Sequence, residues 1–177
     1  MSIESTDVLI VGAGPAGAVA AGFLRQQGRR VVVLEREQFP RFSIGESLLP
    51  QSMEYIEAAG MLRDVVEAGF QFKNGAAFAW GDRHTAFDFR DKFSPGWGTT
   101  YQVQRATFDK VLADAAARMG AEIRFRHEVT AIDLEGDKPR VSVRAAASAS
   151  TLSKVARCTW YVVPQPSENL SRKSKSV

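Results

Sequence analysis

The sequence predicts an α/β fold built on a parallel sheet, and three features near its start predict it. Residues 8–11 form a short apolar run that is typical of a strand, and a glycine-rich turn follows at once. Residues 18–27 form a helix-like run that Gly28 closes, and residues 30–34 form a second strand-like run that ends at Glu35. A strand, a glycine turn, a helix and a second strand ending in an acid make up a Rossmann-like βαβ unit that binds a dinucleotide.

The glycine turn has the pattern G-x-G-x-x-G, and each glycine has an expected role. Gly12 allows the tight turn, Gly14 lets the backbone approach a pyrophosphate, and Gly17 lets the helix pack closely on the strands. The helix N-terminus offers free N–H groups to phosphate, and the acid is placed to accept hydrogen bonds from a ribose. The predicted dinucleotide-binding residues are Gly12, Ala13, Gly14, Pro15, Ala16, Gly17 and Glu35. The alternative is an ordinary βαβ unit whose turn binds nothing.

The rest of the chain up to Ala145 predicts two short helices, an antiparallel β ribbon, a longer helix and a group of strands. The ribbon is expected as an insertion at about residues 70–100, with a bulge or turn at Asn74-Gly75 and a hairpin turn at Gly81-Asp82. Trp80 and Trp97 are expected in the core or in a substrate pocket. The expected elements are helices over 48–59 and 62–68, strands over 70–80, 84–89 and 101–103, a helix capped by Thr107 and ended by Gly120, and strands over 122–125, 128–134 and 140–144.

Composition narrows the functional classes. The chain has 177 residues, 45% of them hydrophobic and 24% charged, as in soluble globular proteins. Its single cysteine excludes a disulfide framework and favours the reducing cytoplasm, and its two histidines have no partner at metal-ligand spacing, so no metal is expected. The net charge of +3 comes from the segment after Ala145, so no nucleic acid is expected as a partner. No apolar run is long enough to span a bilayer, so no membrane is expected.

A second informative stretch, residues 40–50, reads P-R-F-S-I-G-E-S-L-L-P. Together with the glycine turn it resembles the flavin-dependent halogenases that act on phenols and pyrroles, within the aromatic-hydroxylase-like FAD enzymes. The resemblance continues over residues 69–76, 101–105 and 108–109. It implies FAD as the cofactor, and a partial FAD-binding domain of Rossmann-like fold over residues 1–145.

The resemblance also implies where further cofactor contacts lie. It places Ile44, Gly45, Glu46 and Ser47 on a strap near the flavin, Arg41 and Arg105 along the cofactor, and Val129 among the FAD-binding residues. Arg36 follows the ribose acid directly and is expected to stack on adenine or pair with a phosphate, since a guanidinium is always charged and planar. For each arginine the alternative is a solvated surface charge.

Lys73 is the expected catalytic residue. In the halogenases that this chain resembles, a lysine in this sequence context hydrogen-bonds to, or captures the halogen of, hypohalous acid. Such a lysine must be partly removed from water so that its N–H donors are aimed. The residues expected to form an apolar pocket around it are Phe70, Phe72, Ala76, Ala77 and Phe78. The alternative is a lysine on the outer face of an edge strand, where it guards against aggregation.

The implied function is that of an FAD-dependent oxidoreductase that halogenates an electron-rich aromatic in secondary metabolism. The implied partners are a small aromatic substrate, free or carrier-bound, and a separate flavin reductase that supplies FADH2. The alternatives are an FAD-dependent aromatic monooxygenase, an isoprenoid reductase of the geranylgeranyl type and an inactive FAD-binding fragment; a nicotinamide dehydrogenase leaves residues 40–50 without a role. Residues 146–177 lack the family's next Asp-Gly motif and predict a disordered, frameshifted or truncated tail, with residues 160–163 as its one strand-like run.

Overall fold

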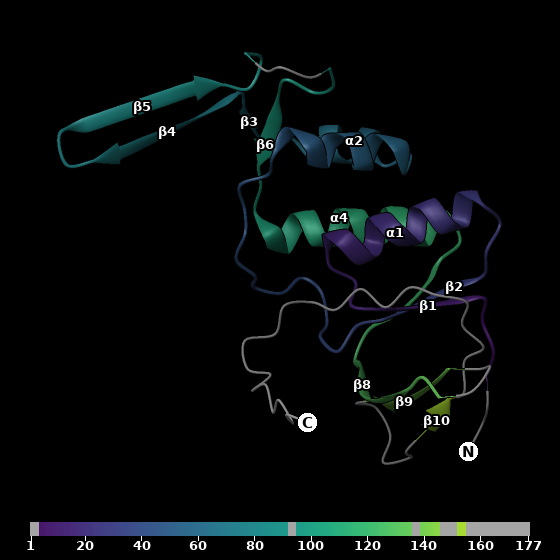
Figure 1. Ribbon diagram of the computed structural model, residues 1–177. Coiled ribbons are helices and arrows are strands. Elements are labelled where there is room, and N and C mark those ends of the chain that lie inside the picture. The colour runs from purple at the N-terminus through teal and green to yellow at the C-terminus, as the bar shows by residue number, and fades with distance from the viewer. Residues whose placement is uncertain (1–3, 92–94, 136–138, 146–151, 155–177) are drawn as a thin grey trace.

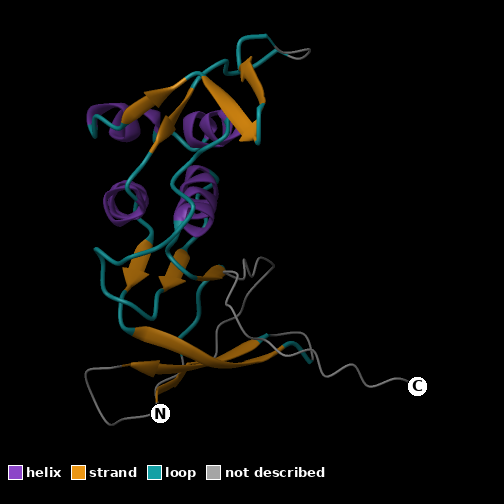
Figure 2. Ribbon diagram, turned by 90° about the vertical axis from the view of Figure 1, so that its left-hand side faces the viewer, coloured by secondary structure: helices purple, strands orange, loops and turns teal. Residues whose placement is uncertain are grey.

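The computed structural model describes residues 4–91, 95–135, 139–145 and 152–154, and it confirms the α/β class. Helices lie between a parallel sheet and an upper group of antiparallel strands, and a second sheet covers the other side of the parallel one (Figures 1 and 2). The elements in chain order are β1 (Val8–Val11), α1 (Pro15–Gln26), β2 (Val31–Leu34), α2 (Pro50–Ala58), α3 (Leu62–Glu67), β3 (Gln71–Lys73), β4 (Gly75–Trp80), β5 (Arg83–Asp88), β6 (Thr100–Gln102), α4 (Arg105–Arg118), β7 (Glu122–Arg124), β8 (His127–Asp133), β9 (Arg140–Ala145) and β10 (Leu152–Lys154).

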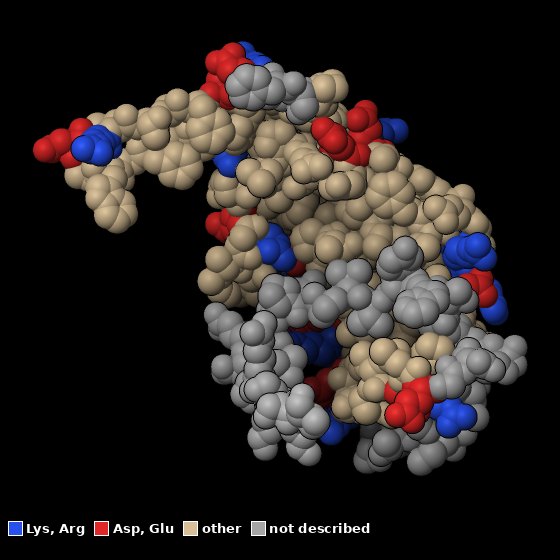
Figure 3. Space-filling view, viewed as in Figure 1, with Lys and Arg blue, Asp and Glu red and all other residues tan. Residues whose placement is uncertain are grey.

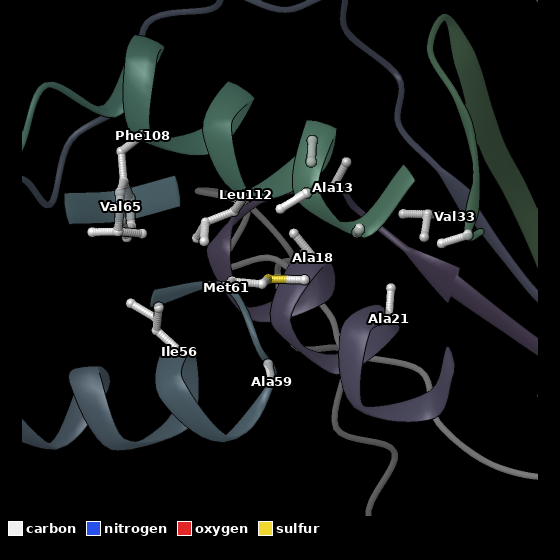
Figure 4. Close-up of a cluster of buried hydrophobic side chains, with 14 of the residues drawn as sticks. Ala13, Ala18, Ala21, Val33, Ile56, Ala59, Met61, Val65, Phe108 and Leu112 are labelled. Atoms are coloured by element: carbon white, nitrogen blue, oxygen red, sulfur yellow. The ribbon is translucent and has the colours of Figure 1, made fainter. Parts of the chain in front are cut away.

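The parallel sheet has the strand order β1-β2-β7, and its first pair is in register from Val8 with Val31 onward. Because side chains alternate along a strand, Ile10 and Val33 lie on the same face, where both are fully buried. Helices α1 and α4 cover this face, and Figure 4 shows their side chains meeting Met61 in the main core cluster. The predicted βαβ unit is therefore confirmed.

The opposite face of the parallel sheet packs against the second sheet, whose order is β10-β9-β8. Leu9, Val32 and Leu34 form a second buried cluster there with Val141 and Val143. Strand β10 pairs antiparallel with β9 and was not expected from the sequence. The predicted strand-like run at residues 160–163 lies outside the described residues, as does most of the predicted tail.

The single strand expected over residues 70–80 is divided at Asn74 into β3 and β4, and neither a turn nor a bulge is assigned at Asn74-Gly75. Strand β3 pairs with β6, whereas β4 pairs with β5 in a ribbon that projects from the body (Figure 1). Trp80 is 87% exposed on this ribbon, so its expected place in the core is wrong. Trp97 is half-buried against the main cluster, where its indole N–H donates to Glu57 over 2.9 Å. Figure 3 shows charged side chains at the tip of the ribbon and a mostly uncharged surface along the ribbon between its tip and the body.

Helix α4 begins two residues before the predicted cap. Its N-cap is Gln104, which makes no side-chain capping hydrogen bond, so the expected capping role of Thr107 is wrong. Gly120 follows the helix with φ 94°, a conformation that glycine adopts without strain. Within the described residues, no helix has the length and apolar character needed to cross a bilayer.

An ion pair at the base of the ribbon gives a pH-dependent prediction. The side chain of Arg90 hydrogen-bonds Asp88, and its backbone N–H donates to Asp88 Oδ1 over 2.8 Å, which together lower the pKa of that carboxyl to about 2. A lowered pKa means that the pair stabilises the fold above the ordinary value of 3.8 and that this contribution is lost as the pH falls toward 2. We expect Arg90→Ala to raise the pKa of Asp88 toward 3.8 in an NMR titration of side-chain carboxyl carbons. An unchanged pKa would contradict this origin.

Candidate functional site

The glycine loop lies between the end of β1 and the start of α1, and it presents backbone with little side chain. Gly12 has φ 97°, and Gly14 is the extended N-cap of the helix, with Pro15 at the first helical position and no side-chain cap. A Cβ added to Gly17 would lie 2.0 Å from the carbonyl oxygen of Gly12, so only glycine lets the helix approach this loop. The uncapped helix N-terminus is suited to binding an anion.

Glu35 lies beside this loop, as its place at the end of β2 predicts. Its carboxylate is buried, and Oε2 accepts a hydrogen bond from the backbone N–H of Ala13 over 2.9 Å. The other oxygen accepts from the N–H of Glu37, also over 2.9 Å. A carboxylate has about four lone-pair sites, so Glu35 keeps acceptor capacity for ribose hydroxyls.

Two of the predicted arginines meet at a buried aspartate. Arg105 donates to Asp109 in a bidentate arrangement, with Nε to Oδ1 at 2.6 Å and Nη2 to Oδ2 at 3.1 Å. Arg41 Nη2 lies 3.5 Å from Asp109 Oδ2 and 4.0 Å from Glu35 Oε2. The side chains of Arg41 and Arg105 are only 14% and 12% exposed, so neither is the solvated surface charge of the alternative reading.

Arg41 is also incompletely satisfied. Its Nε atom is buried and has no hydrogen-bond partner among the described residues, although Glu37 Oε2 lies 3.8 Å away. A buried donor without a hydrogen bond is unusual in a folded protein, and a guanidinium is well matched to phosphate. The arginine therefore has the chemistry to bind an anionic group near the glycine loop and Glu35.

The predicted strap runs beside β6. Ile44 is 81% exposed, but its carbonyl accepts a hydrogen bond from Arg105 Nη1 over 2.5 Å. The carbonyl of Glu46 accepts from the N–H of Val103 over 2.8 Å, and Ser47 forms an isolated bridge with Gln102. Gly45 has φ 97°, and a Cβ there would lie 3.1 Å from Arg105 Nη1. The structure thus brings the strap and Arg105 together.

Lys73 ends strand β3 and reaches back to the strap. Its half-buried side chain donates from Nζ to Ser47 Oγ over 2.6 Å and to the carbonyl of Leu48 over 3.2 Å. The ammonium lies 5.1 Å from the centroid of the Phe89 ring, within the range of a cation–π contact. Lys73 is therefore tied to the strap, unlike an unpaired lysine on the outer face of an edge strand.

The three phenylalanines expected around Lys73 make their ring contacts with other aromatic residues. Phe70 is buried against Phe108, Phe72 packs edge-on against Tyr101, and Phe78 stacks on Phe87 in the ribbon. The chain divides at Asn74 and carries β4, with Phe78, into a different sheet from β3. Phe89, which the sequence reasoning did not select, supplies the ring instead.

Two other predicted cofactor residues, Arg36 and Val129, make no described contact with Glu35, Arg41 or Arg105. The Arg36 side chain is 65% exposed and has its Nε 3.6 Å from Glu37 Oε1, as the surface alternative describes. Val129 lies in β8, half-buried against the second cluster on the face of the parallel sheet away from α1. Sequence reasoning also missed Asp109 as a site residue, although the spacing of Arg105 and Asp109 by four on a helix is a recognised ion-pair signal.

The residues present fit FAD. The bare glycine loop, the uncapped helix N-terminus, the buried acid and the Arg41 Nε, which makes no hydrogen bond to a described residue, together offer groups for pyrophosphate and ribose. In the part of the chain that the structure describes, no group of three or more histidine, cysteine or acidic residues could hold a metal ion.

Comparison with known proteins agrees with this fit. The family model "FAD binding domain" matches residues 5–163. The chain is 36% identical over 137 residues to a tryptophan 2-halogenase of Chondromyces crocatus, a match that covers 77% of this chain and 26% of that protein. The chain therefore spans about a quarter of the length of this curated relative.

Solved structures show the same relationship. A flavoprotein/dehydrogenase from Cytophaga hutchinsonii superimposes with a TM-score of 0.81 at 43% identity, covering 88% of this chain and 38% of that one. The myxobacterial chondrochloren halogenase CndH, a variant of FAD-dependent halogenases, gives a TM-score of 0.79 at 36% identity, covering 90% of this chain and 36% of that one. The family model matches most of this chain, and the chain has the glycine loop and the buried acid that such a domain uses. This protein therefore belongs to the FAD-binding domain family, with FAD as its cofactor.

Proposed function

We propose that this chain is the FAD-binding part of a flavin-dependent halogenase, which uses FADH2, oxygen and halide to halogenate an electron-rich aromatic. The observation that carries the proposal is the ammonium of Lys73, held against the strap by Ser47 Oγ at 2.6 Å and by the carbonyl of Leu48 at 3.2 Å. The similarity to a tryptophan 2-halogenase and to CndH supports it.

Each part of the site has a proposed task. When bound and reduced, FAD would supply, together with oxygen, the oxidising equivalents for the conversion of halide to hypohalous acid. The loop N–H groups hold the pyrophosphate, Glu35 accepts from the ribose, and Arg41 offsets the phosphate charge. Asp109 holds Arg41 and Arg105 in place. Lys73 donates an N–H to the hypohalous acid and directs it to the substrate.

The partners belong to the same proposal. The substrate is a small aromatic, free or attached to a carrier, and a separate flavin reductase supplies FADH2. Chemically reduced FAD replaces the reductase in the assay below, so the chain's own contribution is measured without that partner.

Removing the Lys73 ammonium tests the function. We expect Lys73→Ala to bind FAD as the wild type does, because no described contact of Lys73 reaches the glycine loop, Glu35 or Arg41. We expect bromide-dependent product to fall by about a hundredfold or more, the usual scale for losing a positioned acid–base group. The measurement is product mass after reaction with reduced FAD, oxygen, bromide and a panel of phenols, pyrroles and indoles.

Lys110→Ala is the matched control, since Lys110 pairs with Asp114 on the exposed face of α4. It should leave both FAD binding and product unchanged. A Lys73→Ala variant with undiminished product would remove the assigned role. A wild type that binds FAD but yields a hydroxylated product would replace the halogenase by the monooxygenase, and one that reduces an isoprenoid chain would replace it by the reductase.

A further inference from the structure

Lys73 is unusual among lysines in having its ammonium fixed by several groups at once. A lysine ammonium is normally a mobile, strongly hydrated charge on a flexible stem. Here Nζ donates to Ser47 Oγ and to the Leu48 carbonyl, and the Phe89 ring lies on a further side at 5.1 Å. Of the three N–H donors of the ammonium, two have acceptors among the described residues, and one remains.

The backbone explains why Ser47 is within reach. Strand β3 pairs with β6 so that Lys73 lies opposite Thr100. The strap pairs with the same strand from the other side, through the Ser47–Gln102 bridge and the N–H of Leu48, which donates to Tyr101 over 3.2 Å. Strand β6 therefore holds both the strap and Lys73 in fixed positions. The position of Ser47 is set by main-chain contacts, so it does not depend on the Ser47 hydroxyl.

The chemistry of a hydroxyl suits this place. Ser47 is exposed and its Oγ is neutral, so it accepts from the ammonium without cancelling the positive charge. A carboxylate in the same position would form an ion pair and hold the lysine more tightly. Hydrogen bonds to a charged group are stronger than those between neutral partners, so one hydroxyl is enough to select an orientation.

We propose that Ser47 is a positioning residue for Lys73, and that its hydroxyl orients the ammonium so that the remaining N–H points to the reacting halogen species. This inference rests on the proposed function for its purpose, but the contact between the two side chains is tested independently. It assigns Ser47 a task toward Lys73, in addition to its expected place on the flavin strap.

The contact is tested by NMR of lysine ammonium groups in the full chain, with lysine carrying the heavy nitrogen isotope. An ammonium gives a sharp signal when hydrogen bonds slow its proton exchange with water, and Lys73→Arg identifies the signal that belongs to Lys73. We expect that signal in the wild type, its loss or broadening in Ser47→Ala, and its retention in Ser47→Thr, which keeps the hydroxyl. Ser43→Ala, on the same loop, is the matched control and should leave the signal as it is.

Two results would overturn the inference at this stage. One is a wild type without a protected Lys73 signal, and the other is an identical signal in the wild type and in Ser47→Ala. Neither depends on FAD or on activity, so a chain that makes no halogenated product can still confirm or exclude the contact.

Activity then tests the purpose of the contact. With every variant saturated with FAD, we expect Ser47→Ala to make about tenfold less brominated product per FADH2 consumed, the scale of one hydrogen bond to a charged group. Ser47→Thr should restore the yield. A Ser47→Ala variant with an undiminished yield at saturating FAD would overturn the positioning role.

Discussion

Replacing Asp109 with asparagine is expected to lower the free energy of unfolding by about 3 kcal/mol, since breaking a buried ion pair from one side leaves the partner charge uncompensated. Asp109 is 1% exposed and is the shared counter-charge of Arg105 and Arg41. Asparagine keeps the shape of the side chain but removes the charge, so both guanidiniums lose their main electrostatic partner in a poorly hydrated place. The measurement is urea denaturation followed by circular dichroism.

Asp114→Asn is the matched control for this prediction. Asp114 lies on the same helix and pairs with Lys110, but its side chain is half exposed. Exposed ion pairs of this kind contribute about 0.5 kcal/mol or less. Equal losses in the free energy of unfolding for the two variants would show that the buried Asp109 pairs stabilise the fold no more than the exposed Asp114 pair.

The Asp109→Asn variant should also weaken FAD binding. Arg41 is held near Glu35 partly by Asp109, so we expect the affinity for FAD to fall by about tenfold, the loss of one charge-assisted contact. Quenching of flavin fluorescence measures it under conditions where the variant is folded. An unchanged affinity would mean that Asp109 stabilises the fold without positioning the arginines for the cofactor.

Replacing Gly17 with alanine is expected to destabilise the chain and to abolish tight FAD binding. The new Cβ would lie 2.0 Å from the Gly12 carbonyl oxygen and 3.2 Å from its carbon, so the loop backbone must move. Overpacking of this kind costs about 2 kcal/mol or more. Helix propensity alone predicts the opposite sign, because alanine is favoured over glycine by about 1 kcal/mol inside a helix.

Gly22→Ala separates the two effects in the same helix. Its Cβ would meet the terminal methyl of Met61 at 2.5 Å, and a flexible methionine end can move where a loop carbonyl cannot. We expect Gly22→Ala to cost much less stability than Gly17→Ala and to leave FAD affinity unchanged. Thermal unfolding and FAD titration of both variants are the measurements. A Gly17→Ala chain as stable as the wild type, with normal FAD affinity, would contradict the close approach.

The sequence predicted well those parts of the fold that depend on neighbours along the chain. The run 8–11, the glycine turn and Glu35 are close in sequence, and the structure places them together. The ribbon turn at Gly81-Asp82 was equally local and is confirmed. One local prediction failed, because α4 begins at Arg105 and Thr107 does not cap it. Another failure concerns burial: Trp80 has the pattern of a core residue but extends on a ribbon that the described chain does not cover.

Local chemistry therefore determined that this protein is an α/β nucleotide binder, because strand period, glycine turns and helix ends are set by a few adjacent residues. Only the tertiary structure decided that Asp109 lies between two arginines and that Lys73 is bonded to the strap. The Arg105–Asp109 pair is local, but Arg41 reaches Asp109 from a distant loop, and Ser47 and Lys73 are 26 positions apart. The approach of Ser47 and Lys73 depends on which segments pair with β6, and that pairing is settled by the packing of the whole chain.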